Sequence, residues 1–239
     1  MSFVLVHGAW HGAWCWARVS PLLRAAGHAA YAVTLTGAGE RAHLLSRDIS
    51  LRTHVNDVAN LVECEELAGV VLVGHSYGGL VITGVADRLL AQLPSPLRHL
   101  VYIDAVVPHP GESWSTHHGD ELVAARLSAA AAHPQNALPP PDATLYGLAG
   151  ADAAWVNRRQ TAHPFGMYRE PLTFDSARVA SVPRTFIDCT QPAWPSIAPM
   201  RQRVRAEVGW QVRELPTGHD AMVSAPAALA ALLLQAAAA

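Results

Sequence analysis

The strongest constraint in this chain is a short aliphatic run that ends in a glycine-rich turn. Val70–Val73 reads VVLV, a pattern typical of a strand buried on both faces. The turn that follows, GHSYGG, has the spacing G-x-S-x-G, and Leu80–Leu93 after it has the composition of a helix. A serine on so tight a strand-to-helix turn is held in a strained backbone conformation, with its hydroxyl above the sheet. We therefore predict that Ser76 is a nucleophile.

The rest of the chain alternates strands with helices, the order that gives an α/β fold with a parallel sheet. We expect strands at 3–6, 30–35, 70–73, 100–103, 184–188 and 211–215. We expect helices at 16–26, 53–67, 80–93 and 197–208 and in the C-terminal Ala/Leu run. The ligand site of such a sheet lies beyond the carboxyl ends of the strands, where His7, Ser76 and Asp104 each follow a strand.

The alternation is interrupted between Pro108 and Val182. This stretch contains an Ala-rich segment at 122–132 and three prolines at 139–141, and the sheet pattern resumes after it. We therefore predict a cap at 108–182, inserted into an α/β core formed by 1–107 and 183–239. A cap at the catalytic edge would exclude water and shape an apolar pocket. The proline-rich middle alone reads as a linker, but the return of the strand pattern favours an insertion.

Two further features predict the groups that act with Ser76. His219 follows the last expected strand, in the sequence PTGHD, where the base of a Ser, acid, His order lies. The HGAW loop after the first strand can offer a free backbone N–H to a developing negative charge, and the residue after the nucleophile can offer another. We expect these oxyanion donors to be the amides of Ala9 and Tyr77.

Aromatic side chains and one histidine are candidates for the substrate pocket. We predict that Trp10, His11 and Trp114 contact the substrate. Further candidates for an apolar wall are Trp14, Trp155 and Phe165. Core packing is the alternative role for several of these rings. The spacing of His7 and His11 also fits a metal, but the loop has no acidic third ligand, so we predict no metal site.

The composition of the 239-residue chain narrows the classes of partner. Its net charge of -2 gives no basic surface for nucleic acid, and no apolar run reaches the roughly 18 residues of a membrane span. The G-x-G at Gly37–Gly39 lacks the third glycine of a dinucleotide site, so we predict no cofactor. All 17 basic residues are arginine, which excludes Schiff-base chemistry by lysine. Small soluble partners are favoured.

The cysteines and the N-terminus indicate the compartment. Cys15, Cys64 and Cys189 are an odd number without metal-ligand spacing, so neither a disulfide framework nor a zinc site is indicated. The sequence begins with the strand-like run at 3–6 and shows no signal peptide. We therefore expect a cytoplasmic protein.

Over nearly its full length the chain resembles the α/β-hydrolase superfamily, and within it the hydroxynitrile lyase and plant methyl esterase group. The matching pieces are FVLVHGAWHGAWCW, GHSYGG, HPFGMYREPL and PTGHDAM. The resemblance implies a six-stranded parallel sheet under a small cap, a Ser76–His219 couple with oxyanion donors at Ala9 and Tyr77, a homodimer, and hydrolysis of small carboxylic esters. Similar enzymes that cleave cyanohydrins carry a lysine where this chain has Asp220, which disfavours cyanide elimination.

The chain departs from its group in the catalytic acid. The resemblance implies an aspartate about three residues beyond the first residue of the Cys189–Thr190 pair, but Pro192 occupies that position. Other members of the superfamily take the acid from the end of the fourth strand, where this chain offers Asp104. A carboxylate needs only to lie near the imidazole, so its origin in the chain is free. We assign Asp104, with Asp188 or an acid-free dyad as the alternatives.

These observations predict a serine esterase without a cofactor, acting on small, apolar or aromatic carboxylic esters through an acyl-enzyme. A C–C bond hydrolase or a lyase would use the same Ser-His site, so the motif alone does not separate these reactions. A ligand sensor, in which the capped pocket binds a small apolar molecule, is the alternative from another class.

Overall fold

A computed structural model of the chain describes residues 1–94 and 96–238. Its centre is a parallel sheet of six strands in the order β2-β1-β3-β4-β7-β8. In chain order the strands are β1 (Ser2–Val6), β2 (Ala29–Val33), β3 (Val70–His75), β4 (Leu97–Ile103), β7 (Arg184–Cys189) and β8 (Trp210–Leu215). The predicted α/β fold with six parallel strands is confirmed. The central strand β3 is buried along its whole length, as its unbroken aliphatic run predicts.

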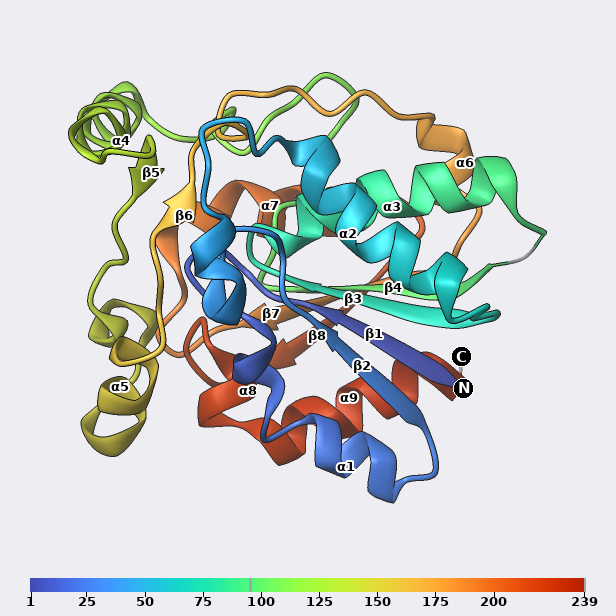
Figure 1. Cartoon of the computed structure of the whole chain (residues 1–239). Helices are drawn as coiled ribbons and strands as arrows, with labels where there is room; N and C mark the ends of the chain where they lie inside the picture. The colour runs from blue at the N-terminus through green and yellow to red at the C-terminus, as the bar shows by residue number, and fades with distance from the viewer. Residues whose placement is uncertain (95, 239) are drawn as a thin grey trace.

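Helices cover both faces of this sheet (Figure 1). One face carries α1 (Ser20–Ala25), α8 (Ala221–Ser224) and α9 (Pro226–Ala238). The other carries α2 (Leu51–Cys64) and α3 (Gly78–Gln92), which pack against each other, while α7 (Ala198–Ala206) packs beside β8. Among the described residues, no helix is long and apolar enough to cross a membrane.

Several helix boundaries differ from those expected, and two of them have a clear local cause. The predicted helix at 16–26 is shorter: a 3-10 turn at Ala13–Trp16 ends where it was expected to begin, and α1 starts only at Ser20, with Pro21, which lacks an N–H, in its first turn. Helix α2 begins before the predicted Thr53. Its start is fixed by a capping box in which the Ser50 side chain accepts from the Thr53 backbone and the Thr53 hydroxyl accepts from the Ser50 backbone.

The connection between β4 and β7 contains the segment predicted as a cap. It holds α4 (Asp120–Ala132), α5 (Gly150–Asn157) and an antiparallel pair, β5 (Ala137–Leu138) and β6 (His163–Pro164). Figure 1 shows these four elements gathered at one end of the molecule, beyond the carboxyl ends of the sheet strands. The last helix of the connection, α6 (Ser176–Ala180), instead returns to pack on α3.

Candidate active site

Ser76 lies on the sharp turn between β3 and α3, with a φ of +53°. Such a left-handed conformation is costly for a residue with a side chain, so the surrounding structure must hold it. Glycines make the tight turn feasible: a Cβ added at Gly74 would lie 2.6 Å from the Gly78 carbonyl oxygen, and one at Gly78 would lie 2.8 Å from the His7 carbonyl oxygen. The strained elbow predicted from G-x-S-x-G is therefore present.

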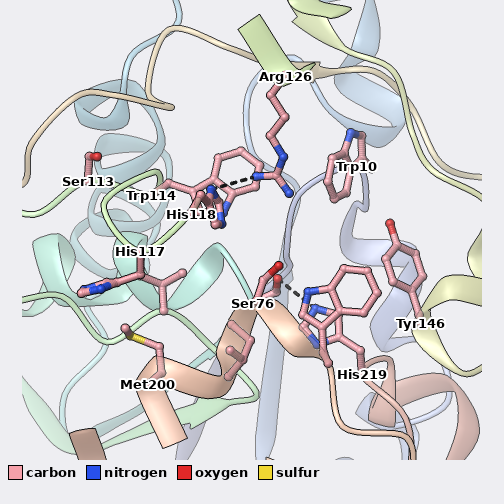
Figure 2. Close-up of a pocket in the computed structure, with 14 residues that line it drawn as sticks. Trp10, Ser76, Ser113, Trp114, His117, His118, Arg126, Tyr146, Met200 and His219 are labelled. Atoms are coloured by element: carbon pink, nitrogen blue, oxygen red, sulfur yellow. Dashed lines mark hydrogen bonds between the residues drawn. The ribbon is translucent and has the colours of Figure 1, made fainter. Parts of the chain in front are cut away.

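His219 follows β8 and reaches back to Ser76. Its Nε2 lies 3.0 Å from Ser76 Oγ, and its backbone N–H donates to the Tyr146 carbonyl oxygen at 2.9 Å. Two rings pack against the imidazole: Trp194 stacks on it with centroids 5.1 Å apart, and the centroid of His75 lies 4.6 Å away. These contacts restrict the imidazole, and Figure 2 shows its hydrogen bond to Ser76.

Asp104, immediately after β4, contacts the other nitrogen of that imidazole. Its Oδ2 lies 2.6 Å from His219 Nδ1, and the carboxylate is fully buried. Its backbone also has a positive φ, +42°, and its N–H donates to the Ile187 carbonyl oxygen. With Nδ1–H donating to Asp104, Nε2 of His219 is free to accept a proton from Ser76.

The alternative acid, Asp188, is held away from His219 by arginines. Arg201 bridges the two carboxylates, with Nη2 2.5 Å from Asp104 Oδ1 and Nε 2.5 Å from Asp188 Oδ1. Arg205 binds the second oxygen of Asp188 at 2.6 Å. Asp188 therefore neutralises the arginine that orients Asp104, and Asp104 is the carboxylate that contacts the imidazole.

The loop after β1 lies against Ser76. A Cβ added at Gly8 would come within 2.8 Å of Ser76 Cβ, so only glycine fits there. His7 Nδ1–H donates to the Gly8 carbonyl oxygen at 2.7 Å, while its Nε2 accepts from the Leu35 N–H at 3.0 Å. Because the two ends of a trans peptide point in opposite directions, anchoring the Gly8 carbonyl also fixes the direction of the Ala9 N–H. Burial lowers the pKa of His7 to about 3, so the ring stays neutral in this role.

The second predicted donor, the Tyr77 amide, lies at the N-terminus of α3. Among the described residues, neither this N–H nor that of Ala9 donates a hydrogen bond within the protein. The Tyr77 side chain is buried, and its hydroxyl lies 3.0 Å from His54 Nδ1. His54 Nε2–H donates to the Thr36 carbonyl oxygen, so its Nδ1 accepts from Tyr77. Both candidate oxyanion donors therefore sit on firmly anchored backbone.

His11 does not take the predicted place in the substrate pocket. Its ring is buried beside the pocket, with Nε2 3.0 Å from Asp220 Oδ2 and Nδ1 2.8 Å from the Ala9 carbonyl oxygen. Both neighbours are acceptors, so both ring nitrogens carry protons and the ring is an imidazolium. Burial alone would lower the pKa of His11, but the charge and hydrogen bond of Asp220 outweigh it and raise the pKa. The structure therefore places the His11 ring in a buried ion pair with Asp220, outside the lining of the pocket around Ser76.

His7 and His11, whose spacing in the sequence fits a metal site, use both ring nitrogens in contacts within the protein. His7 bonds to backbone groups through both nitrogens, and His11 does so with Asp220 and Ala9. Among the residues that the structure describes, no group of three or more His, Cys, Asp or Glu side chains could hold a metal ion.

The pocket above Ser76 is small, and its wall combines apolar side chains with serines, histidines and one arginine. The structure brings Trp10 and Trp114 into its wall, whereas Trp14, Trp155 and Phe165 do not line it. The sequence did not indicate Trp194, Arg126, Tyr146 and Met200, which also line it. Figure 2 labels the last three. Trp194 could have been found from its place in the loop after β7, at the catalytic edge. The others come from the connection above the sheet and from α7, where no motif marks them.

Comparison with known proteins finds relatives over nearly the whole chain. The sequence profile of the alpha/beta hydrolase family matches residues 3–232. The chain is 39% identical over 240 residues to the carbendazim hydrolyzing esterase of Nocardioides sp., an alignment that covers 96% of each protein. It is also 36% identical over 118 residues to methyl jasmonate esterase 1 of Vitis vinifera, which covers 48% of this chain and 42% of that enzyme.

Solved structures share the whole fold. An extracellular alpha/beta-hydrolase of a Paenibacillus species, described as sharing structural and functional homology with tobacco salicylic acid binding protein 2, matches with a TM-score of 0.85 at 22% identity. That match covers 99% of this chain and 98% of the other. A methylesterase from Arabidopsis matches with a TM-score of 0.76 at 25% identity, over 100% of this chain and 99% of that protein.

Proposed function

The chain belongs to the alpha/beta hydrolase family, and we propose that it is a serine carboxylesterase that cleaves small carboxylic esters through an acyl-enzyme. The observation that carries this proposal is the hydrogen-bonded series Asp104–His219–Ser76, with contacts of 2.6 and 3.0 Å. Similarity to proteins named as esterases supports the same reaction.

In the proposed reaction His219 Nε2 takes the proton of Ser76 as Oγ attacks the ester carbonyl carbon. The buried Asp104 carboxylate holds the imidazole in the required tautomer and stabilises the imidazolium that forms. His219 then gives its proton to the departing alcohol, which leaves an acyl group on Ser76. In the second half His219 activates a water that releases the acid.

The amides of Ala9 and Tyr77 are the proposed oxyanion donors. Both lie next to Ser76, one on the β1 loop and the other at the start of α3. Preorganised N–H groups stabilise charge that develops only in the transition state, and losing one typically costs on the order of 3 kcal/mol of barrier. The anchoring of these two backbone segments therefore matters to rate as well as to stability.

The pocket favours an apolar or aromatic group on the ester. Trp10, Trp114 and Met200 supply apolar surface around the reacting serine. Asp220, the residue that replaces the lysine of similar cyanohydrin-cleaving enzymes, is fully buried against His11 and outside the pocket lining. This arrangement supports ester hydrolysis over cyanide elimination.

A panel of p-nitrophenyl acetate, short methyl esters and carbendazim tests the proposal. We expect Ser76→Ala to lower kcat by about a million-fold. Ser181→Ala is the matched control, because Ser181 is exposed just after α6 and lies outside the pocket lining, and it should keep the wild-type rate. Equal rates in wild type and Ser76→Ala would remove the proposal, and tight binding of these compounds without turnover would favour a sensor.

We further propose a cytoplasmic location and a homodimer. The location is supported by Cys15, Cys64 and Cys189, which are free thiols. Cell fractionation and size-exclusion chromatography with light scattering measure the two properties independently of the activity.

A further inference from the structure

Arg126 brings a positive charge into a pocket that contains no carboxylate. It lies on α4 and is the one arginine in the described lining of the pocket around Ser76, which includes no aspartate or glutamate. Figure 2 shows its guanidinium pointing into the pocket, on the side away from His219. Among the described residues, no carboxylate lies within ion-pair distance of it, unlike Arg201, Arg203 and Arg205.

Aromatic rings hold this guanidinium in place. Its central carbon lies 4.9 Å from the Trp114 ring, 5.4 Å from Tyr168 and 5.9 Å from Trp10. Such contacts stabilise a cation and fix the plane of the fork, but they use none of its N–H donors. The side chain is therefore oriented in advance while its hydrogen-bonding capacity stays open.

The protein uses little of that capacity. The Tyr168 hydroxyl is one hydrogen-bonding partner of the guanidinium, and this interaction opposes the lowering of the Arg126 pKa by burial. Of the five N–H donors of a guanidinium, one other makes a long contact, 3.4 Å from Nη1 to His118 Nδ1. That nitrogen already lies 2.9 Å from the Tyr168 hydroxyl, so Arg126 shares an acceptor that is in use. Burial and the nearby Arg126 charge lower the pKa of His118 to about 4, so His118 adds no second positive charge at neutral pH. None of the Arg126 nitrogens is sealed from solvent without a partner.

Arg126 also lies at the boundary between two cavities, the pocket at Ser76 and a larger groove outside it. The chamber at Ser76 has a volume of about 30 Å³, whereas an apolar groove of about 700 Å³ lies outside it. Trp10, Arg126 and Trp194 line both. A molecule with its ester carbonyl at Ser76 would therefore carry its non-reacting end past the guanidinium on the way to the groove.

We propose that the preferred substrates are esters whose non-reacting part carries a carboxylate, bound by the Arg126 fork. A planar carboxylate accepts two parallel N–H bonds from a guanidinium, a strong and geometrically specific pairing. The flanking indoles of Trp10 and Trp114 cover part of this pair and favour a short aliphatic or aromatic spacer. This inference rests on the proposed esterase function and names the substrate class of the same site.

The test compares kcat/KM for monomethyl esters of dicarboxylic acids with neutral methyl esters in which an isopropyl group replaces the carboxylate. Monomethyl succinate, glutarate and adipate vary the spacer. We expect the ratio of charged to neutral ester to fall roughly 10- to 100-fold in Arg126→Met, the effect of losing charge-assisted hydrogen bonds. Arg126→Lys, which keeps the charge and loses the fork, should give an intermediate ratio. A ratio unchanged in Arg126→Met overturns the inference.

The matched control is Arg159→Met. Arg159 also lies over an indole, 4.6 Å from the Trp155 ring, but it does not line the pocket, so its loss should leave the ratio unchanged. Tryptophan fluorescence can also measure the binding of free glutarate and adipate to Ser76→Ala, which gives a readout that does not depend on turnover. If neutral esters are hydrolysed and the ratio of kcat/KM for charged to neutral esters does not depend on Arg126, the inference is overturned while the proposed esterase function stands. Arg126-dependent dicarboxylate binding without hydrolysis of any ester supports the anion site and overturns the esterase.

Discussion

The His11 imidazole lies 3.0 Å from the Asp220 carboxylate, and this ion pair is buried beside the two loops that meet at Ser76. His11 also donates to the Ala9 carbonyl oxygen, and Asp220 directly follows His219 in the chain. The pair therefore ties the loop that carries a proposed oxyanion donor to the loop that carries the proposed base.

Removing one member of this pair should destabilise the protein strongly. Asp220→Asn leaves a buried imidazolium without its counterion, and we expect the free energy of unfolding to fall by about 3–5 kcal/mol. The control is Asp152→Asn, which breaks a half-exposed pair with Arg18 and should cost less than about 1 kcal/mol. Urea unfolding curves measure both changes, and equal losses in the two variants would contradict the prediction.

The same pair predicts how stability depends on pH. Burial alone would raise the pKa of Asp220, but the neighbouring His11 charge and hydrogen bond lower it below its ordinary 3.8, while the pKa of His11 is raised above 6.5. The contribution of Asp220 to the free energy of unfolding is therefore present above pH 3.8 and is lost as the pH falls through the pKa of Asp220 in the folded protein. The His11 contribution is present below pH 6.5 and lost as pH rises through its folded pKa.

The stability of the wild type should thus exceed that of the double variant His11→Gln, Asp220→Asn most clearly between pH 3.8 and pH 6.5, the ordinary pKa values of the two groups. The difference in Tm between the two proteins should shrink as the pH rises past the folded pKa of His11. A difference that grows steadily into alkaline pH would show that the pair is not ionised as the contacts require.

The two candidate acids should respond very differently to substitution. Asp104→Asn keeps the size of the side chain but favours the wrong tautomer of His219, and we expect kcat to fall by about ten-thousand-fold. Asp188→Asn removes a carboxylate that touches Arg201 and Arg205 but not the imidazole, so it should cost at most about tenfold. Single-turnover release of p-nitrophenol measures the difference, and a larger loss in Asp188→Asn would reassign the acid.

The fold and the central elements of the site could be predicted because each has a local signal. The run VVLV before GHSYGG identified a buried strand and the Ser76 turn, and Asp104 and His219 were found because each follows a strand at the same edge of the sheet. The position of each strand fixes where its carboxyl end lies, so short motifs on separate strands converge. Their meeting at hydrogen-bond distance follows from the topology.

The residues that the sequence does not place correctly depend on long-range contacts. The sequence predicts that His11 contacts substrate, but its ring turns toward Asp220, a partner 209 positions away. Arg126 lies on α4, whose residues are mostly exposed and carry no amphipathic pattern, so nothing local shows that one side chain enters the pocket. Side-chain direction within a cap depends on packing that one sequence does not reveal.

The close contact between Gly8 and Ser76 leads to the last prediction. A Cβ in Gly8→Ala would lie 2.8 Å from Ser76 Cβ and 2.9 Å from His75 Nδ1, both on the buried elbow, so the β1 loop must move away. The Ala9 amide moves with it, and we expect kcat to fall by roughly 100- to 1000-fold with a smaller change in KM, since the donor acts on the transition state. Gly119→Ala is the control, because its φ is -64° and no atom lies within 4 Å of an added Cβ. Wild-type kcat in a folded Gly8→Ala, checked by its urea midpoint, would show that the Ala9 amide does not hold the oxyanion.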